Sequence, residues 1–103
     1  MSGPGIRVAI IDDHEAIRVG MAVAIGGAEE DVRVVAGSTT VGDFLARRVP
    51  DVDVVLLDLN LGDDSDPKDN AEALRAAGIR VLVYSIADNV RLLRRALAGG
   101  ADG

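Results

Sequence analysis

The chain has 103 residues, no cysteine and a net charge of −6. This length allows one domain, which we place at residues 1–103. The acidic balance argues against direct binding of this segment to nucleic acid or to an anionic membrane, and the lack of cysteine excludes disulfides and thiolate metal sites. No signal peptide or membrane span is recognisable, so we expect a cytoplasmic location.

Four strand-like runs alternate with four helical segments. The strand-like runs are 6–11, 32–37, 53–57 and 79–85. The helical segments are about 14–25, from Thr40 to before Pro50, from Pro67 to Gly78, and about 88–98. Strands that alternate with single helices through short connections predict right-handed crossovers, and therefore an α/β fold with a doubly wound parallel sheet.

The helical segments carry start signals and apolar faces. Thr40 and Asp66 are expected to cap the second and third helices, with Pro67 at the first helical position. The side chains expected to face inward are Ile17, Gly20, Met21, Ala24 and Ile25 in the first helix, Val41, Phe44 and Leu45 in the second, and Val90, Leu93 and Leu97 in the fourth.

Two apolar strands end in carboxylates. Asp12 and Asp13 follow the first strand, and Asp58 follows the third. Ligands of a doubly wound sheet bind at the carboxyl ends of its strands, so these three acids would meet if the strands are neighbours. Such a cluster needs a cation to offset its repulsion, and all-oxygen ligation suits Mg²⁺. The alternative is that each aspartate is an ordinary turn or helix-capping residue.

The motifs "IIDDH", "VVLLDLNL" and "VLVYS" together resemble the receiver domain of bacterial two-component response regulators. The resemblance covers nearly the whole chain in order. The "DDH" opening and the "RALAGGADG" ending are most similar to the NarL/LuxR-type branch, whose members usually carry a helix-turn-helix DNA-binding domain. The resemblance implies a flavodoxin-like (CheY-like) sheet with strand order 2-1-3-4, and a fifth strand and last helix that this chain lacks.

The resemblance also implies roles for individual residues. Asp58 matches the aspartate that accepts a phosphoryl group from a sensor histidine kinase, so the chain would be a switch that regulates transcription, and not an enzyme. Asp12 and Asp13 match the acidic pair that holds Mg²⁺, and the backbone carbonyl of Asn60 matches a further metal ligand. Ser85 matches the hydroxyl that moves toward the new phosphoryl group.

The sequence departs from the family pattern at three places. The family's active-site lysine would lie beyond Gly103, and Lys68, the sole lysine, is expected to be a surface residue. Ile86 stands where the family more often has a small residue, which would restrict phosphoryl entry. The segment 62–70 lacks the usual proline and glycine spacing, and we interpret it as a rebuilt loop and helix cap, not as a second metal site.

Two other functions remain open at this point. One is a pseudo-receiver that binds partners without phosphate, which Ile86 and the absent lysine favour. The other is a phosphohydrolase of the haloacid-dehalogenase kind, which would need an acid in place of Asn60 and a nucleophile on the first strand.

Five other polar positions receive plain structural interpretations. We expect His14 to be a surface residue at a helix start and Tyr84 to serve in packing. The arginines at 91, 94 and 95 are expected to form a solvated basic face on the fourth helix.

The last expectation concerns the sheet edge. Without a fifth strand, residues 81–85 would form an apolar edge with unpaired backbone groups. We therefore expect that the natural protein continues past Gly103, or that a second copy, a swapped element or a rearranged helix covers this edge.

Overall fold

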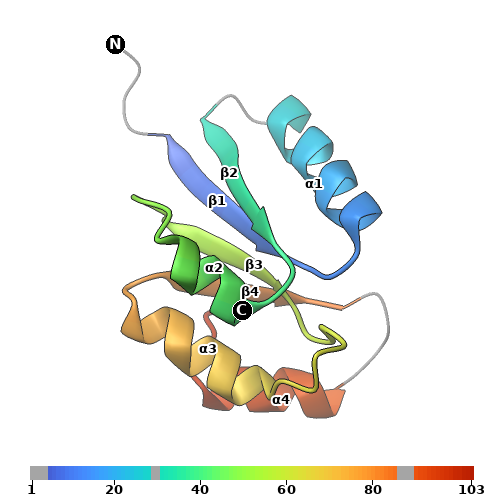
Figure 1. The fold of residues 1–103 in the computed structure, drawn as a ribbon, viewed down its shortest axis with the longest axis vertical. Helices are drawn as coiled ribbons and strands as arrows, with labels where there is room; N and C mark the ends of the chain where they lie inside the picture. The colour runs from blue at the N-terminus through green and yellow to red at the C-terminus, as the bar shows by residue number, and fades with distance from the viewer. Residues whose placement is uncertain (1–4, 29–30, 86–89) are drawn as a thin grey trace.

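The computed structural model describes residues 5–28, 31–85 and 90–103. In chain order the elements are β1 (Ile6–Ile11), α1 (Glu15–Ala28), β2 (Val32–Ser38), α2 (Val41–Arg47), β3 (Val54–Asp58), α3 (Pro67–Ala76), β4 (Arg80–Tyr84) and α4 (Val90–Ala98) (Figure 1). The predicted alternation of strands and helices is confirmed. The expected start of the fourth helix near residue 88 lies outside the described residues.

All four strands are parallel, and their order is β2-β1-β3-β4, as predicted. The chain crosses from β1 to β2 in one direction and from β2 past β1 to β3 in the other, so the order reverses between β1 and β3. Ile11 pairs with Leu57 at the end of the β1–β3 ladder. Asp12 and Asp58 therefore leave the sheet side by side, at the position where α/β sheets bind ligands.

One face of the sheet carries the main core. Alternate strand residues point to this face, where α2 and α3 cover them. The buried cluster comprises Ala9, Ile11, Val41, Phe44, Val52, Val55, Leu57, Leu61, Leu74, Ile79 and Val81. Val, Leu, Ile and Ala dominate it, as the composition predicts, and Phe44 is the only aromatic member.

α1 lies beside β1 and β2, apart from α3 and α4 (Figure 1). None of its described side chains is buried. Ile17, Met21 and Ile25 are half-buried, which agrees with the predicted face, but Gly20 and Ala24 are exposed and the prediction is wrong for them. The helix packs mainly along β2, so only a narrow stripe of it meets the sheet.

The predicted inward face of α4 is also wrong in part. Val90 and Leu97 are 51% and 47% exposed, whereas Ala96 is fully buried. The reason is close packing of α4 on α3, because a Cβ atom at Gly99 would lie 2.3 Å from the carbonyl oxygen of Lys68. Small residues must face α3 here, and the larger ones turn outward.

The helix caps follow the predictions. The Thr40 hydroxyl accepts a hydrogen bond from the Asp43 N–H at 3.0 Å, and the Asp66 carboxylate accepts one from the Lys68 N–H at 2.9 Å. Gly78 follows α3 with a φ of +81°, a backbone conformation that favours glycine.

The edge of β4 is not left unpaired, contrary to our expectation. The Asp102 N–H donates to the Val81 carbonyl at 2.7 Å, and the Val83 N–H donates to the Gly103 carbonyl at 2.6 Å. The Asp102 carboxylate also accepts from the Val81 N–H at 2.9 Å and pairs with Arg75 at 3.2 Å. The last residues of the chain itself therefore cover the start of this edge.

Candidate functional site

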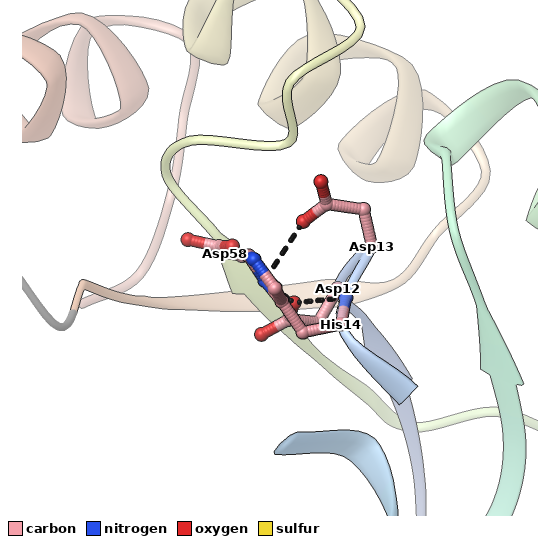
Figure 2. A group of neighbouring side chains, drawn as sticks. All are labelled: Asp12, Asp13, His14 and Asp58. Carbon is pink, nitrogen blue, oxygen red and sulfur yellow. Dashed lines mark hydrogen bonds and ion pairs between the residues drawn. The ribbon is translucent and has the colours of Figure 1, made fainter. Parts of the chain in front are cut away.

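Four side chains converge where β1 and β3 end. Asp12, Asp13, His14 and Asp58 each offer one potential ligand atom, and these atoms all lie within 4.8 Å of one another (Figure 2). Within residues 5–28, 31–85 and 90–103 this is the only such group of three or more. The sheet register explains the convergence, since Asp12 and Asp58 directly follow the paired residues Ile11 and Leu57.

The Asp12 side chain is only 2% exposed, and three hydrogen-bonding groups contact its carboxylate. Its Oδ1 atom accepts from the His14 backbone N–H at 2.8 Å and lies 3.0 Å from the imidazole Nδ1 atom. Its Oδ2 atom accepts from the Tyr84 hydroxyl at 2.5 Å. Burial raises the pKa of Asp12, but the hydrogen bonds from Tyr84 and His14 outweigh it and bring the pKa below its ordinary value.

The Asp58 carboxylate is also buried, but it accepts fewer hydrogen bonds than that of Asp12. Its Oδ1 atom accepts from the Asn60 N–H at 3.0 Å, and no hydrogen bond from the described residues reaches its Oδ2 atom. Burial raises the pKa of Asp58, and the nearby charges of Asp12 and Asp13 raise it further against the opposing Asn60 hydrogen bond. One carboxylate oxygen thus remains available for an incoming group.

Asp13 and His14 form the exposed side of the cluster. The His14 Nδ1 atom lies 3.1 Å from Asp13 Oδ1, and the two side chains are 58% and 35% exposed. The hydrogen bond with Asp12 and the charge of Asp13 raise the pKa of His14. His14 lies directly before α1 and is exposed, as expected of a surface residue at a helix start, but its imidazole is also part of the acidic cluster, which the sequence did not indicate.

The loop after β3 passes close to Asp13. Gly62 has a φ of +74°, and a Cβ atom there would lie 3.0 Å from Asp13 Oδ2. A side chain at this position would be strained and would crowd the cluster.

Tyr84 was expected to serve in packing, but its hydroxyl contacts the site directly. Tyr84 pairs with Asp58 in the β3–β4 ladder, so its side chain points to the same face as Asp58 and reaches Asp12. The sequence signal for this contact is that Tyr84 and Asp58 occupy matching positions at the ends of their strands. Ser85 follows Tyr84 and therefore lies at the same carboxyl edge of the sheet.

Other residues considered from the sequence lie elsewhere. Lys68 pairs with Glu72 on α3 at 3.8 Å, as expected of a surface residue. In the segment 62–70, Asp63 accepts hydrogen bonds from Ser65, and Asp66 forms an ion pair with Arg95. Arg95 therefore does not belong to a purely solvated basic face, whereas Arg91 and Arg94 are exposed. Ile86 lies outside the described residues.

The donor set suits a divalent cation. Three carboxylates gather where the sheet order reverses, two of them buried, and the available oxygen of Asp58 adds to their negative potential. Hard divalent ions prefer such oxygen ligands, so the cluster could hold a metal ion.

No protein-family model and no curated protein matches this sequence. Solved structures do match. A LuxR family DNA-binding response regulator from Silicibacter pomeroyi is 34% identical with a TM-score of 0.75, and the match covers 95% of this chain and 75% of that one. The signal receiver domain of a response regulator, NarL, from Mycobacterium tuberculosis is 28% identical with a TM-score of 0.76, over 96% of this chain and 81% of that one.

A LuxR family two-component response regulator from Aurantimonas sp. SI85-9A1 has the same fold, with a TM-score of 0.80 at 24% identity, over 96% of this chain and 71% of that one. The four parallel strands in the order β2-β1-β3-β4, with their four helices, form a flavodoxin-like receiver fold. The chain belongs to the LuxR/NarL family of response regulators, as a receiver domain. No helix among its described residues is long and apolar enough to cross a membrane.

Proposed function

We propose that this domain is a phosphorylation-dependent signalling switch, and that Asp58 accepts the phosphoryl group. The observation that carries the proposal is the buried Asp58 carboxylate, which lies against Asp12 and Asp13 with one oxygen free of hydrogen bonds from the described residues. Membership of the response-regulator family supports the same function.

The chemistry is a phosphoryl transfer to a carboxylate. An oxygen of Asp58 forms a new bond to phosphorus, and the bond from phosphorus to the donor breaks, with its electron pair leaving on the donor's nitrogen or oxygen. The product is an acyl phosphate on Asp58. The hydrogen bond from the Asn60 N–H to Oδ1 fixes the carboxylate, so that Oδ2 is the oxygen directed at the donor.

Mg²⁺ suits this role, and it would be held by Asp13 and Asp58 with the Asn60 carbonyl, supported by Asp12. When bound it would offset the charge of the phosphoryl oxygens. The negative charges of Asp12 and Asp13 next to Asp58 would attract the cation. The cation could reach the cluster from solvent on its exposed side, at Asp13.

The wider assignments belong to the same proposal. The donor would be a sensor histidine kinase in the cytoplasm. Ser85, at the carboxyl edge beside Asp58, would move to hydrogen-bond the new phosphoryl group and favour the active conformation. The response would pass to a DNA-binding output domain, since the relative from Silicibacter pomeroyi is a DNA-binding response regulator.

The test is incubation of the protein with acetyl phosphate and Mg²⁺, followed by intact mass analysis. We expect one added phosphoryl group that hydroxylamine removes, because acyl phosphates react with it. Asp58→Asn should abolish the addition. The matched control is Asp63→Asn, which changes an exposed loop acid that only caps Ser65 and should leave labelling intact. No labelling of the wild-type protein would favour a phosphate-independent receiver, and undiminished labelling of Asp58→Asn would assign another acceptor.

A further inference from the structure

Arg18 reaches the edge of the candidate site from α1. Its Nη1 atom donates a hydrogen bond to the backbone carbonyl of Asp12 at 2.6 Å, and the residue is half-buried. This carbonyl belongs to the peptide group that joins Asp12 to Asp13. The proposed phosphoryl transfer uses the carboxylates of these two residues, but it gives no reason why an arginine should hold the peptide between them.

The Asp12 carbonyl lies just beyond the regular sheet. The ladders from β1 to β2 and to β3 both end at Ile11, which pairs with Ser38 and Leu57. The Asp12 N–H still donates to the Ser38 carbonyl at 3.0 Å, so β2 fixes one side of this residue. Because Asp12 is buried, the carbonyl on its other side needs a donor from the protein. The guanidinium of Arg18 supplies that donor.

The orientation of this peptide decides where Asp13 lies. A peptide group is planar, so a donor that fixes the Asp12 carbonyl also fixes the Asp13 N–H and the direction in which the Asp13 Cα atom leaves the sheet. The Asp13 Oδ1 atom lies 3.1 Å from Nδ1 of His14, whose side chain is 58% exposed. An ion pair with such an exposed partner restrains a carboxylate only weakly. The position of Asp13 therefore depends on its backbone.

Arg18 contacts the backbone on both sides of Asp13. Its own N–H donates to the His14 carbonyl at 3.1 Å in the first turn of α1, while its guanidinium holds the Asp12 carbonyl. These two hydrogen bonds connect α1 to residues 12 and 14. The helix thus helps to place the acidic residue between them.

β2 leaves room for the arginine side chain at Gly37. A Cβ atom at this position would lie 3.3 Å from Arg18 Cδ and 3.6 Å from Arg18 Nε. The arginine therefore crosses the strand where the strand has no side chain of its own. A larger residue at position 37 would press on the arginine near the end that reaches Asp12.

We propose that Arg18 is a positioning residue for the phosphoryl-transfer site. By holding the Asp12 carbonyl, it orients the peptide between the two acids and so directs the Asp13 carboxylate toward the cation. This inference rests on the proposed function, because the cation held by Asp13 is the one that the transfer uses.

The direct test compares the Mg²⁺ affinity of two variants, read from the amide shifts of residues 58–60. Arg18→Met keeps a long unbranched side chain without a donor, and it should weaken Mg²⁺ binding about tenfold, as loss of a group that orients metal ligands typically does. Arg18→Lys retains a donor and should recover part of this loss. An affinity of Arg18→Met equal to that of the wild type would overturn the inference.

Arg47→Ala is the matched control, because Arg47 is the other arginine at the end of β2. Its Nη1 atom donates to the Gly37 carbonyl at 2.7 Å and to the Ser38 hydroxyl at 3.0 Å, with no hydrogen bond to Asp12 or Asp13 among the described residues. Arg47→Ala should lower the free energy of unfolding and leave the Mg²⁺ affinity unchanged. The same loss of affinity as in Arg18→Met would assign the effect to general loosening of β2, against the inference.

A double-mutant cycle asks whether Arg18 acts through Asp13. Asp13→Asn removes the charge that Arg18 is proposed to place, so the effect of Arg18→Met on Mg²⁺ affinity should shrink to less than about twofold in that background. A tenfold loss that persists in Asp13→Asn would show that Arg18 acts through another group, and the inference would be wrong.

The two proposals can fail separately. If Asp58 is labelled with acetyl phosphate and Arg18→Met binds Mg²⁺ as tightly as the wild type, the switch stands and the role of Arg18 is wrong. If Arg18→Met shows the expected loss but Asp58 of the wild type is never labelled, the positioning role stands and the phosphoacceptor is wrong. If Mg²⁺ does not bind at residues 12–13 and 58–60, the inference about Arg18 is wrong.

Discussion

The sheet face covered by α2 and α3 differs sharply from the opposite face, although the same strands build both. On the first face Val55, Leu57 and Val81 have no exposed surface. On the other face Leu56 is half-buried and Leu82 is 41% exposed, because α1 stays beside β1 and β2. The central strand β1 also buries apolar side chains on this other face, through Val8 and Ile10.

The candidate site lies on the more open side of this division. Strand alternation places Asp58 with Leu56 and Tyr84 with Leu82, and the Tyr84 hydroxyl then reaches Asp12. Packing on the face covered by α2 and α3 holds β1 and β3 in register. This register fixes the positions of the carboxylates at the ends of the two strands. Asp12 and Asp58 are buried, but the exposed side chains of Asp13 and His14 beside them open the cluster to solvent, which a site that exchanges ions and phosphoryl groups requires.

The largest predicted change in the free energy of unfolding comes from truncating a buried leucine, and a leucine on the other face serves as its matched control. Leu74 on α3 is fully buried in the main core, and Leu74→Ala should lower the free energy of unfolding by about 3 kcal/mol. Leu82→Ala, on the open face, should lower it by less than about 1 kcal/mol. Urea denaturation of both variants measures the difference. Equal losses would mean that the two faces are equally packed.

The second prediction concerns the hydrogen bond between Tyr84 and Asp12. Tyr84→Phe removes only the hydroxyl and leaves the buried Asp12 carboxylate without one of its donors. Hydrogen bonds to charged groups contribute about 1.5–3 kcal/mol, so we expect a loss of about 1–2 kcal/mol for this half-buried ring. Urea denaturation without divalent ions measures it. Unchanged stability would show that the hydroxyl does not hold Asp12 in solution.

The third prediction is a gain in stability when Asp58 is replaced. Burial and the charges of Asp12 and Asp13 raise the pKa of Asp58, so its ionised form destabilises the folded state at neutral pH. Asp58→Asn should therefore raise the free energy of unfolding, on the order of 1 kcal/mol, in the absence of metal. The gain should disappear as the pH falls below the ordinary pKa of an aspartate, where the wild-type carboxyl is protonated in both states. A loss of stability at neutral pH would contradict the assigned repulsion.

The smallest change in stability is expected from a variant at the junction of α3 and α4, away from the site. The Arg95 hydrogen bond lowers the pKa of the half-buried Asp66 from 3.8 to about 2. A lowered folded-state pKa stabilises the fold above the unfolded value and loses this contribution as the pH falls from about 4 to 2. Asp66→Asn retains a helix cap and should melt slightly below wild type at pH 6 and level with it near pH 2. A constant difference across this range would exclude the ion pair as its cause.

The sequence predicted the parts that depend on local pattern. The strands, their order and the caps at Thr40 and Asp66 are confirmed, and the predicted convergence of Asp12, Asp13 and Asp58 is present in the structure. The strands and caps follow from apolar runs and capping side chains, whereas the strand order, on which the meeting of the three acids depends, was implied by the resemblance to receiver domains.

The sequence did not predict features that depend on how elements meet. The hydroxyl of Tyr84 reaches Asp12 only because β4 aligns with β3, and the imidazole of His14 turns back because Asp12 holds its backbone. The buried face of α4 is set by the close contact between Gly99 and Lys68, which a helical pattern of large apolar residues cannot reveal.

The measurement that tests the central claim most directly is a Mg²⁺ titration of the protein followed by backbone amide NMR. The account places the cation between the ends of β1 and β3, so the first and largest shifts should occur at residues 12–13 and 58–60. The acidic segment 62–70, which comprises a loop and the first turn of α3, is an internal control, because it has its own carboxylates but no metal cluster among the described residues. Shifts at the two strand ends would support the site, whereas shifts confined to 62–70 would contradict it.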